Sequence, residues 1–312
     1  MTWVAWRQQR TETLIAAAIL AALAALLIPT GIQMASAYHH DGLAACLGSQ
    51  PSGPCNGAIQ SFQERFGQLG DFISWFTLIP GLIGILLAAP FILQLEHGTY
   101  RLDWTQGITR RRWIVGKLGL AIAAALVIAL ALTLLITWWR TPLVHLQGRM
   151  ENSVFDSEGM VVFGYILFAL GLATAVGVVW RRAVPALVVA FAGYFIARLF
   201  VDTWLRQRLI APLHTTWKAS SAQPPKLNQA WVLSESASDK FGHAIKAVPR
   251  QCAPVPNGHP ACLTDAAPPY MHAVYQPASH FWPLQGIETG IFAGIALALI
   301  LFAAWWTHQR AA

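Results

Sequence analysis

The chain has 312 residues, of which 55% are hydrophobic and only 11% are charged. Soluble globular proteins carry about 25% charged residues, so this composition excludes an ordinary water-soluble fold and indicates an integral membrane protein. The formal net charge is +7, but the basic residues fall in short clusters between apolar stretches, which argues against a nucleic-acid partner.

Six apolar stretches approach or reach the length of about 20 residues that a membrane-crossing helix needs. They cover residues 14–35, 72–95, 118–139, 160–180, 183–201 and 287–307. No small-residue cleavage site follows the first stretch, so we interpret it as a span. The fifth is the weakest because Arg198 lies inside it, and we expect this side chain to reach the membrane surface. The sequence therefore predicts an all-α membrane protein with six spans.

Lys and Arg residues accumulate at one end of these spans, which predicts their orientation. That end holds Arg7, Arg10, Arg101, Arg110, Arg111, Arg112, Lys117, Arg181, Arg182 and Arg310, whereas the opposite short loops hold only Arg65, Arg140 and Arg149. The basic end is predicted to be cytoplasmic. Residues 1–13 and the tail 308–312 then lie on the cytoplasmic side of the plasma membrane, and the long segment 202–286 forms an external cap.

All four cysteines fall in segments that are predicted to be external. Their spacing favours two local disulfides, Cys46 with Cys55 and Cys252 with Cys262, on an oxidising face. Four free thiols, or pairing between the two loops, remain the alternatives. A metal site is not expected, because neither pair has the CxxC spacing of a zinc site and the external histidines are scattered.

Several kinds of chemistry are missing from the sequence. The chain has no phosphate-binding loop, since Gly116-Lys117 lacks the upstream glycine and the following hydroxyl residue, so any ATP must bind another subunit. The spans hold almost no carboxylate or histidine at mid-depth, which disfavours ion-coupled transport. No catalytic constellation is recognised, and the sequence leaves open whether the chain has enzymatic activity.

The segment 96–117, between the second and third spans, has a regular pattern. Glu96 ends the second span, Gly98 follows, an amphipathic stretch covers 100–106, and Gly107 precedes a basic start of the third span. This pattern predicts a short helix on the membrane surface. The basic residues fit either the charge rule alone or a docking surface for a partner, and the pattern does not separate these two interpretations.

Two blocks of sequence resemble ABC-2 type transporter permeases, especially their actinobacterial branch. The first block, Pro90 to Leu118, reads P-F-I-L-Q-L-E-H-G-T-Y-R-L-D-W-T-Q-G-I-T-R-R-R-W-I-V-G-K-L and is similar to an E-x-G-T…R-x-R-W…K-L signature. The second, Tyr275 to Glu288, is similar to Y-Q-P-A-S-R-F-W-x-F-Q-x-x-E, and Trp3 to Arg10 resembles W-x-x-R-R-Q-R. The chain departs from the branch at Gly107, where Ser is common, and at His280, where Arg is usual.

The resemblance implies a fold, partners and site residues. It implies a permease with six membrane helices, paired with a second permease copy or a paralogue and with two copies of a separate ABC ATPase that bind ATP and Mg. Residues 1–13 would be a connecting helix at the cytoplasmic surface. The coupling contact with the ATPase would involve Glu96, Gly98, Thr99, Tyr100, Arg101, Asp103 and Trp104.

Two further patterns concern packing. Gly286, Gly290 and Gly294 share one face of the sixth span and predict close approach by a neighbouring helix, although a flexible gate is the alternative. The aromatic residues of the cap form either an interfacial belt or the lining of an exit, and they are Trp204, Trp217, Trp231, Phe281 and Trp282.

The predicted function is that of the membrane subunit of an ABC exporter for a lipophilic or amphipathic molecule such as a drug, a lipid or a modified peptide. Two alternatives belong to other classes. One is a cell-envelope enzyme or assembly factor that acts through the external loop. The other is a sensor subunit that binds a ligand and transports nothing.

Overall fold

The computed structural model describes residues 2–47, 53–73, 77–101, 109–150, 152–245, 252–253, 261–262 and 270–310. Within these ranges, six helices are long and apolar enough to cross a membrane. They are α1 (Thr2–His40), α4 (Ile79–Glu96), α6 (Arg110–Gln147), α8 (Val161–Trp180), α9 (Ala183–Phe200) with its extension to Leu209, and α11 (Phe281–Arg310). Each lies over one of the six predicted spans, including the weak fifth one.

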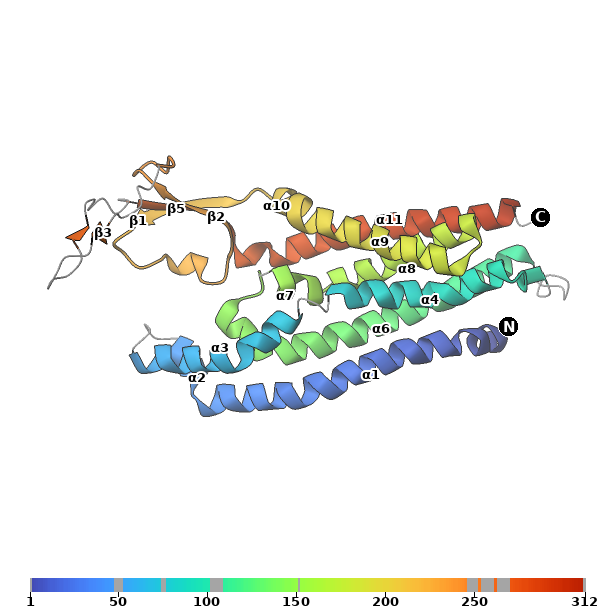
Figure 1. Cartoon of the computed structure of the whole chain (residues 1–312), viewed down its shortest axis with the longest axis horizontal. Helices are drawn as coiled ribbons and strands as arrows, with labels where there is room; N and C mark the ends of the chain where they lie inside the picture. The colour runs from blue at the N-terminus through green and yellow to red at the C-terminus, as the bar shows by residue number, and fades with distance from the viewer. Residues whose placement is uncertain are drawn as a thin grey trace.

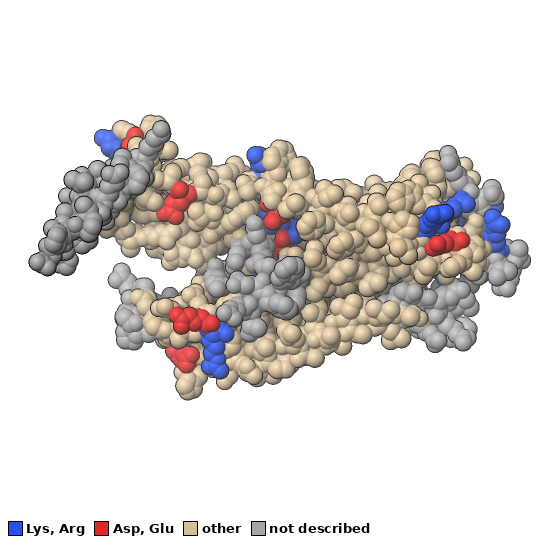
Figure 2. All heavy atoms as spheres, in the orientation of Figure 1, with Lys and Arg blue, Asp and Glu red and all other residues tan. Residues whose placement is uncertain are grey.

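The six helices form one elongated bundle with both chain termini at the same end (Figure 1). We call this the inner end and the opposite one the outer end. At about 1.5 Å per residue, the 39 residues of α1 and the 38 of α6 are nearly twice as long as a bilayer core of about 30 Å, so both helices continue beyond it. Figure 2 shows a broad uncharged surface along the bundle, with charged residues near the inner end and toward the outer end.

Helix α8 lies at the centre of the bundle and packs against α4, α6, α9 and α11. Glycines permit these contacts. A Cβ atom added to Gly84 of α4 would lie 2.4 Å from the backbone oxygen of Ile166, and one added to Gly171 of α8 would lie 3.0 Å from that of Ala296. The backbones therefore approach closely, as small residues allow in membrane helices.

The fifth span changes its helical form before it ends. After α9, residues Val201–Leu205 form the π-helical turn η2, and Arg206–Leu209 continue as the short helix α10. Eight α-helical residues would rotate Arg206 by about 80° past Arg198. A π turn uses more residues for each rotation, so η2 reduces this offset and brings the two arginines toward one face.

A helical hairpin extends the bundle at the outer end. Helix α2 (Leu43–Leu47) follows α1, and α3 (Gly53–Ile73) runs back toward the membrane helices (Figure 1). A disulfide joins Cys46 to Cys55, which confirms the first predicted pair. Phe62 of α3 packs edge-on against Tyr38 of α1, with 6.4 Å between the ring centroids, and fixes the hairpin on α1.

The segment between α10 and α11 forms a β-sheet, so the all-α prediction holds for the membrane part alone. Strands β1 (Leu213–Lys218), β5 (Tyr270–Gln276) and β2 (Trp231–Ser238) are antiparallel in the order β1-β5-β2. The 3-10 turn η3 (Pro225–Leu227) covers this sheet, with Leu227 buried against Ala273 and Tyr275. We call residues 213–245 and 270–276 the external sheet domain, a name that follows the predicted orientation of the chain.

A second, two-stranded sheet pairs β3 (Cys252–Ala253) with β4 (Ala261–Cys262). Its backbone register places Cys252 opposite Cys262. The side chains of these cysteines lie outside the described part of the chain, so the second disulfide stays a prediction.

Two shorter elements complete the outer end. Helix α7 (Asn152–Ser157) precedes α8, and the 3-10 turn η4 (Ala278–His280) leads into α11. Helix α11 begins at Phe281, before the predicted boundary at residue 287. The first two turns of α11 contain Gln285 and Glu288, whose polar side chains are buried against other helices and do not face lipid.

We predict that Gly84→Ala weakens the packing of α4 on α8. The added methyl group would overlap the backbone of Ile166, and overpacking of this kind costs about 1–3 kcal/mol. The control is Gly119→Ala in α6, where no described atom lies within 4 Å of the added Cβ. Thermal unfolding of the purified protein should show a lower midpoint for the first variant alone, and equal midpoints would contradict this account of the α4–α8 contact.

Candidate functional site at the two ends of the bundle

At the inner end, a turn follows α4 and carries most of the residues that the sequence assigned to coupling. Gly98 has a φ of +68°, a left-handed conformation that favours glycine and ends the helix. Thr99 and Arg101 are exposed beside it, whereas Tyr100 is buried. Asp103 and Trp104 belong to residues 102–108, which lie outside the described part of the chain.

Glu96 links this turn to the fifth span. Its carboxylate oxygen Oε2 accepts a hydrogen bond of 2.8 Å from the backbone N–H of Ala183, the first residue of α9. The first N–H groups of a helix have no partner within the helix, and a carboxylate is favourable there because of the helix dipole. Glu96 therefore acts as a cap that joins the end of α4 to the start of α9.

Tyr100 fixes the same turn to the second and third spans. Its ring lies 6.3 Å from that of Trp113 on α6, and Trp113 in turn lies 5.4 Å from Phe91 on α4. The guanidinium of Arg101 lies 6.0 Å from the Tyr100 ring and remains exposed. The turn after α4 is thus attached to α4, α6 and α9, with Arg101 on its surface.

The outer end contains a buried cluster of charged residues from distant parts of the sequence. We call it the outer ion cluster, and its members are Asp156 (α7), Tyr165 (α8), Arg198 (α9), Asp202 (η2), Arg206 (α10) and Glu288 (α11). All of them except Asp202 are buried. Residues from six helical segments therefore meet at one polar site inside the bundle.

Arg206 lies at the centre of this cluster and is 1% exposed. Its Nε donates to Glu288 at 2.9 Å and its Nη1 donates to Asp202 at 2.8 Å. Its Nη2 reaches both Asp156 and, at 3.0 Å, the other oxygen of Glu288. This guanidinium therefore binds three carboxylates, and the contact with Glu288 is bidentate, the strongest geometry for such a pair.

Arg198 supplies the second guanidinium. It forms ion pairs with Asp156 and, at 3.3 Å, with Glu288, and it donates a hydrogen bond of 2.6 Å to the hydroxyl of Tyr165. The guanidinium also lies over the Tyr165 ring, 3.8 Å from its centroid. Burial by itself would raise the pKa of Asp156, but Arg198 and Arg206 override this effect and hold that pKa below its ordinary value.

Gln285 attaches α11 to the neighbouring turn. Its side-chain oxygen accepts from the backbone N–H of Val161 at 2.9 Å, and its amide nitrogen donates to the carbonyls of Phe155 and Glu158 at 2.8 and 3.0 Å. Gln285 therefore provides hydrogen-bond partners for a backbone N–H at the start of α8 and for two backbone carbonyls at the end of α7 and just after it. Gln285 and Glu288 are the last two specified positions of the second sequence block, whose structural role was not evident from sequence.

A second buried pair lies beside the outer ion cluster. Glu158, in the turn between α7 and α8 and outside the membrane-spanning helices, approaches Nε of Arg140 on α6 at 3.5 Å. Burial raises the pKa of Glu158 from 4.5 to about 7, against the opposing attraction of Arg140 and Arg149. The pair is too widely spaced for a strong hydrogen bond, so the attraction does not offset the loss of hydration.

The outer ion cluster corrects one expectation from sequence and adds a feature that the sequence did not predict. Arg198 does not extend to the membrane surface but is buried in ion pairs, and Arg206 lies one π turn beyond it. Buried carboxylates are present, because Asp156 and Glu288 come together from segments far apart in the chain. An arginine within an apolar stretch was the one signal that sequence offered, since such residues in spans usually face the protein interior.

The glycine face of α11 has no close neighbour within the described part of the chain. No atom there lies within 4 Å of a Cβ added to Gly286, Gly290 or Gly294. Helix α11 packs on α8 through its opposite face, where Phe292 and Ala296 are buried. Close approach to these glycines therefore stays a prediction for contact with another chain.

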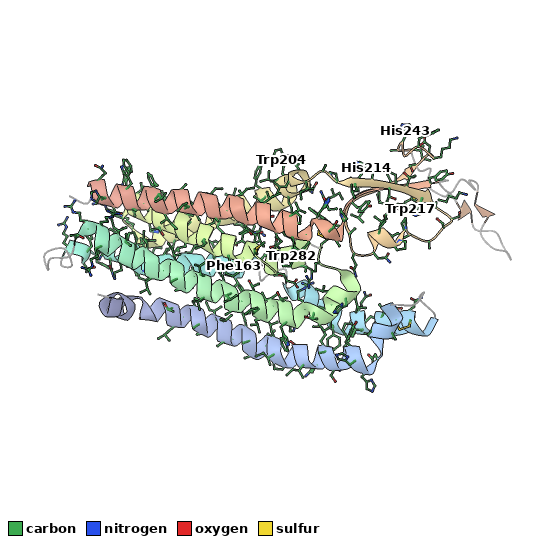
Figure 3. All side chains as sticks on the ribbon, turned by 180° about the vertical axis from the view of Figure 1, so that it is seen from behind. Phe163, Trp204, His214, Trp217, His243 and Trp282 are labelled. Carbon is green, nitrogen blue, oxygen red and sulfur yellow. A yellow bond between two sulfur atoms is a disulfide. The ribbon has the colours of Figure 1, made fainter. Side chains whose placement is uncertain are left out.

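The aromatic residues of the cap fall into two groups. Trp204 and Trp282 are half-exposed near the outer ends of the membrane helices (Figure 3), whereas Phe281 is buried against Phe155. Trp217 and Trp231 contribute to apolar clusters that involve the external sheet domain. Only the first two residues have the position expected of an interfacial belt.

Comparison with protein families agrees with this architecture. The model of the ABC-2 membrane transporter related family matches residues 17–206, more than half of the chain. No curated protein and no solved structure matches the chain.

The chain therefore belongs to the ABC-2 membrane transporter related family. Membership implies a multi-pass permease subunit of an ABC transporter, an ABC ATPase partner and, in general, a dimeric arrangement. The match begins within α1 and ends at Arg206, so the external sheet domain and α11 lie beyond it.

We predict that Arg206→Gln is strongly destabilising. Removing one partner from a buried ion network leaves uncompensated charge and costs about 3–5 kcal/mol. The matched control is Arg208→Gln on the same short helix, because Arg208 lies over Trp204 in a more exposed position. Thermal unfolding in detergent should show a much lower midpoint for the first variant, and similar midpoints would contradict a structural role for the outer ion cluster.

The raised pKa of Glu158 predicts that the stability of the fold depends on pH. Its pKa in the folded protein, about 7, lies above the ordinary 4.5, so the folded state binds a proton more tightly than the unfolded state. Its stabilising contribution is complete below pH 4.5 and is lost as the pH rises through 7. The change in the free energy of unfolding across this range is up to about 3 kcal/mol.

The test measures unfolding midpoints of the wild type and of Glu158→Gln between pH 5 and about pH 8, a range that covers the window expected from linkage. The neutral glutamine should flatten the decline and leave the variant the more stable protein at the upper end. An unchanged slope in the variant would show that another group titrates there.

Proposed function

We propose that this chain is the membrane subunit of an ABC exporter that moves a lipophilic or amphipathic molecule outward across the plasma membrane. Two copies of a separate ATPase would bind ATP and Mg and drive the cycle. A second permease copy or a paralogue would complete the pathway, in contact with the glycine face of α11. In this proposal the inner end and both termini face the cytoplasm, as the distribution of Lys and Arg predicts.

The observation that carries the proposal is the attachment of the turn after α4. Tyr100 is buried between α4 and α6, and Glu96 caps α9. A partner that pushes on the exposed Thr99 and Arg101 would therefore act on three spans at once. Transmission of this kind requires a rigid element with two positions and needs no catalytic side chain.

Helix α9 would carry this displacement toward the outside. The backbone N–H of its first residue, Ala183, donates a hydrogen bond to Glu96, while Arg198 near its end belongs to the outer ion cluster. The same cluster holds α7, α8 and α11, so the outer ends of these helices would move together. The transport pathway would then lie along the remaining surfaces of the bundle and between the two permease copies.

We predict that Arg101→Glu disrupts the ATPase contact and leaves the permease folded. Arg101 is exposed at the inner end, so reversal of its charge should disturb an interface and spare the bundle. Arg65→Glu on α3, an exposed arginine at the outer end, is the matched control. Co-purification of a co-expressed ABC ATPase should fall at least about tenfold for Arg101→Glu alone, equivalent to 1.4 kcal/mol of binding free energy.

Two outcomes would change the assignment. Undiminished ATPase binding and transport in Arg101→Glu, and also in Tyr100→Ala, would remove the proposed coupling role from this turn. Vesicles that contain both subunits and show ligand-stimulated ATP hydrolysis without movement of the ligand would identify a sensor in place of an exporter.

A further inference from the structure

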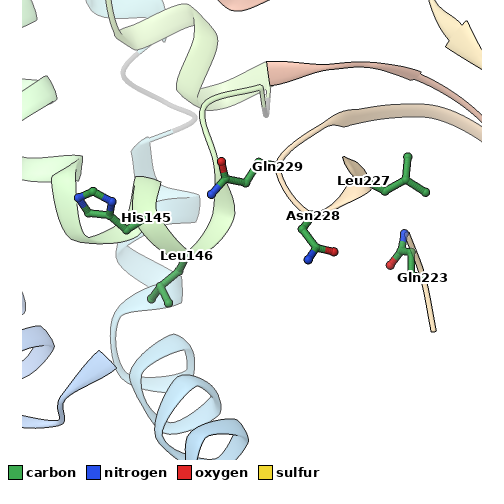
Figure 4. A pocket seen from close by; sticks show the side chains of 6 residues that line it. All are labelled: His145, Leu146, Gln223, Leu227, Asn228 and Gln229. Carbon is green, nitrogen blue, oxygen red and sulfur yellow. The ribbon is translucent and has the colours of Figure 1, made fainter. Parts of the chain in front are cut away.

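A cleft of about 700 Å³ lies at the outer end, between the end of α6 and the external sheet domain (Figure 4). Pockets of about 300–1,000 Å³ accommodate drug-sized ligands. One wall comes from the last turns of α6 and the other from η3 and its flanking residues. The lining residues are His145, Leu146, Gln223, Leu227, Asn228 and Gln229.

Both walls are held in place by packing behind them. The ring of His145 lies 6.0 Å from that of Tyr38 on α1, with 31° between the two planes. Leu227 is buried in the core of the external sheet domain, and the backbone N–H of Asn228 donates to the carbonyl of Pro225 at 3.1 Å. The cleft is therefore largely preformed, which reduces the entropy that a ligand would have to overcome.

The wall residues meet at one close contact. Gly148, just after α6, has a φ of +82°, and a Cβ added there would lie 2.9 Å from Cβ of Gln229. A glycine is needed at this position for both its conformation and its contact. The side chain of Gln229 is thereby positioned at the edge of the cleft nearest to the turn that follows α6 (Figure 4).

The lining has a distinct chemistry. Three of its six side chains are carboxamides and one is an imidazole, while Leu146 and Leu227 supply apolar contact. Each carboxamide offers two N–H donors and one acceptor oxygen, and none of the six residues is an acid, a lysine or an arginine. Among the described residues, such a lining matches hydroxyl or amide groups better than an ionised group, for which it offers no carboxylate, lysine or arginine as a counter-charge.

The walls of the cleft belong to two groups of helices, each joined by its own hydrogen bonds, and the groups pack together through α6 and α8. Gln276 donates to the carbonyl of Ile210 at 2.7 Å and ties the external sheet domain to α10, beside the outer ion cluster. On the other side, Trp139 of α6 donates to Thr30 of α1 at 2.9 Å and joins those two helices. A relative shift of these groups would change the width of the cleft.

We propose that this cleft binds the uncharged, hydroxyl- or amide-bearing head of an amphipathic molecule at the outer face of the protein. The amphipathic class rests on the proposed function, and the neutral polar head is assigned from the lining. The apolar tail would extend along the membrane-facing surface of α6, where Leu134 and Trp138 are exposed.

The test measures binding to the full chain in lipid nanodiscs, without any ATPase. The probe is a fluorescent alkyl glucoside, compared with an alkyl trimethylammonium and an alkyl sulfate that carry the same chain and fluorophore. Empty nanodiscs give the background from partition into lipid. The glucoside should bind more tightly than either charged probe, and saturably.

The double variant Asn228→Ala/Gln229→Ala should weaken glucoside binding at least about tenfold, equivalent to 1.4 kcal/mol. The variant keeps the Cβ atom of residue 229, which Gly148 faces, and an unchanged unfolding midpoint would show that the variant remains folded. Gln223→Ala tests the same wall at a separate position. The matched control removes two amides outside the cleft, Gln60→Ala/Gln63→Ala on α3, and should bind like the wild type.

Equal glucoside binding by the wild type and the cleft variants, or a preference for a charged probe, would overturn the proposal. Because the measurement needs neither ATP hydrolysis nor movement of a substrate, its outcome is independent of the proposed function. Specific binding without transport would contradict the proposed exporter function and support the proposed binding site. Transport that is unaffected by the cleft variants, together with unchanged binding, would reject the site alone.

Discussion

The guanidinium of Arg206 binds Glu288, Asp202 and Asp156, and the outer half of the structure depends on this arrangement. Burial of one such charge costs several kcal/mol unless its partners arrive with it. The segments α7, α8, α9–α10 and α11 must therefore meet at one point, since each supplies a member of the network. The π turn η2 follows from the same requirement, because it brings Arg206 toward the face of Arg198.

Helix α9 joins this network to the inner end. At one end it receives the carboxylate of Glu96, and near the other it contributes Arg198 to the outer ion cluster. The α1–α6 pair is bound to the network less directly, through packing on α8 and the widely spaced Arg140–Glu158 pair.

The membrane helices were predictable because their signal is local. Each span is an apolar stretch of sufficient length, and that signal persisted even for the fifth one, where Arg198 interrupts it. The turn after α4 was recognisable from Glu96 and Gly98, but its attachments were not. Ala183 lies 87 residues from Glu96, and the contact of Tyr100 with Trp113 depends on how α4 and α6 pack together. The external sheet domain was missed, since its short strands alternate irregularly between buried and exposed positions.

The sequence by itself determined the class of protein and the six spans and favoured the local disulfide between Cys46 and Cys55, all of which depend on composition or on residues close together. Only the tertiary structure decided what the charged residues of the spans do. An arginine in an apolar stretch is compatible with exposure at the membrane surface or with burial beside carboxylates. The choice depends on whether Asp156 and Glu288 reach it, and folding alone brings them there.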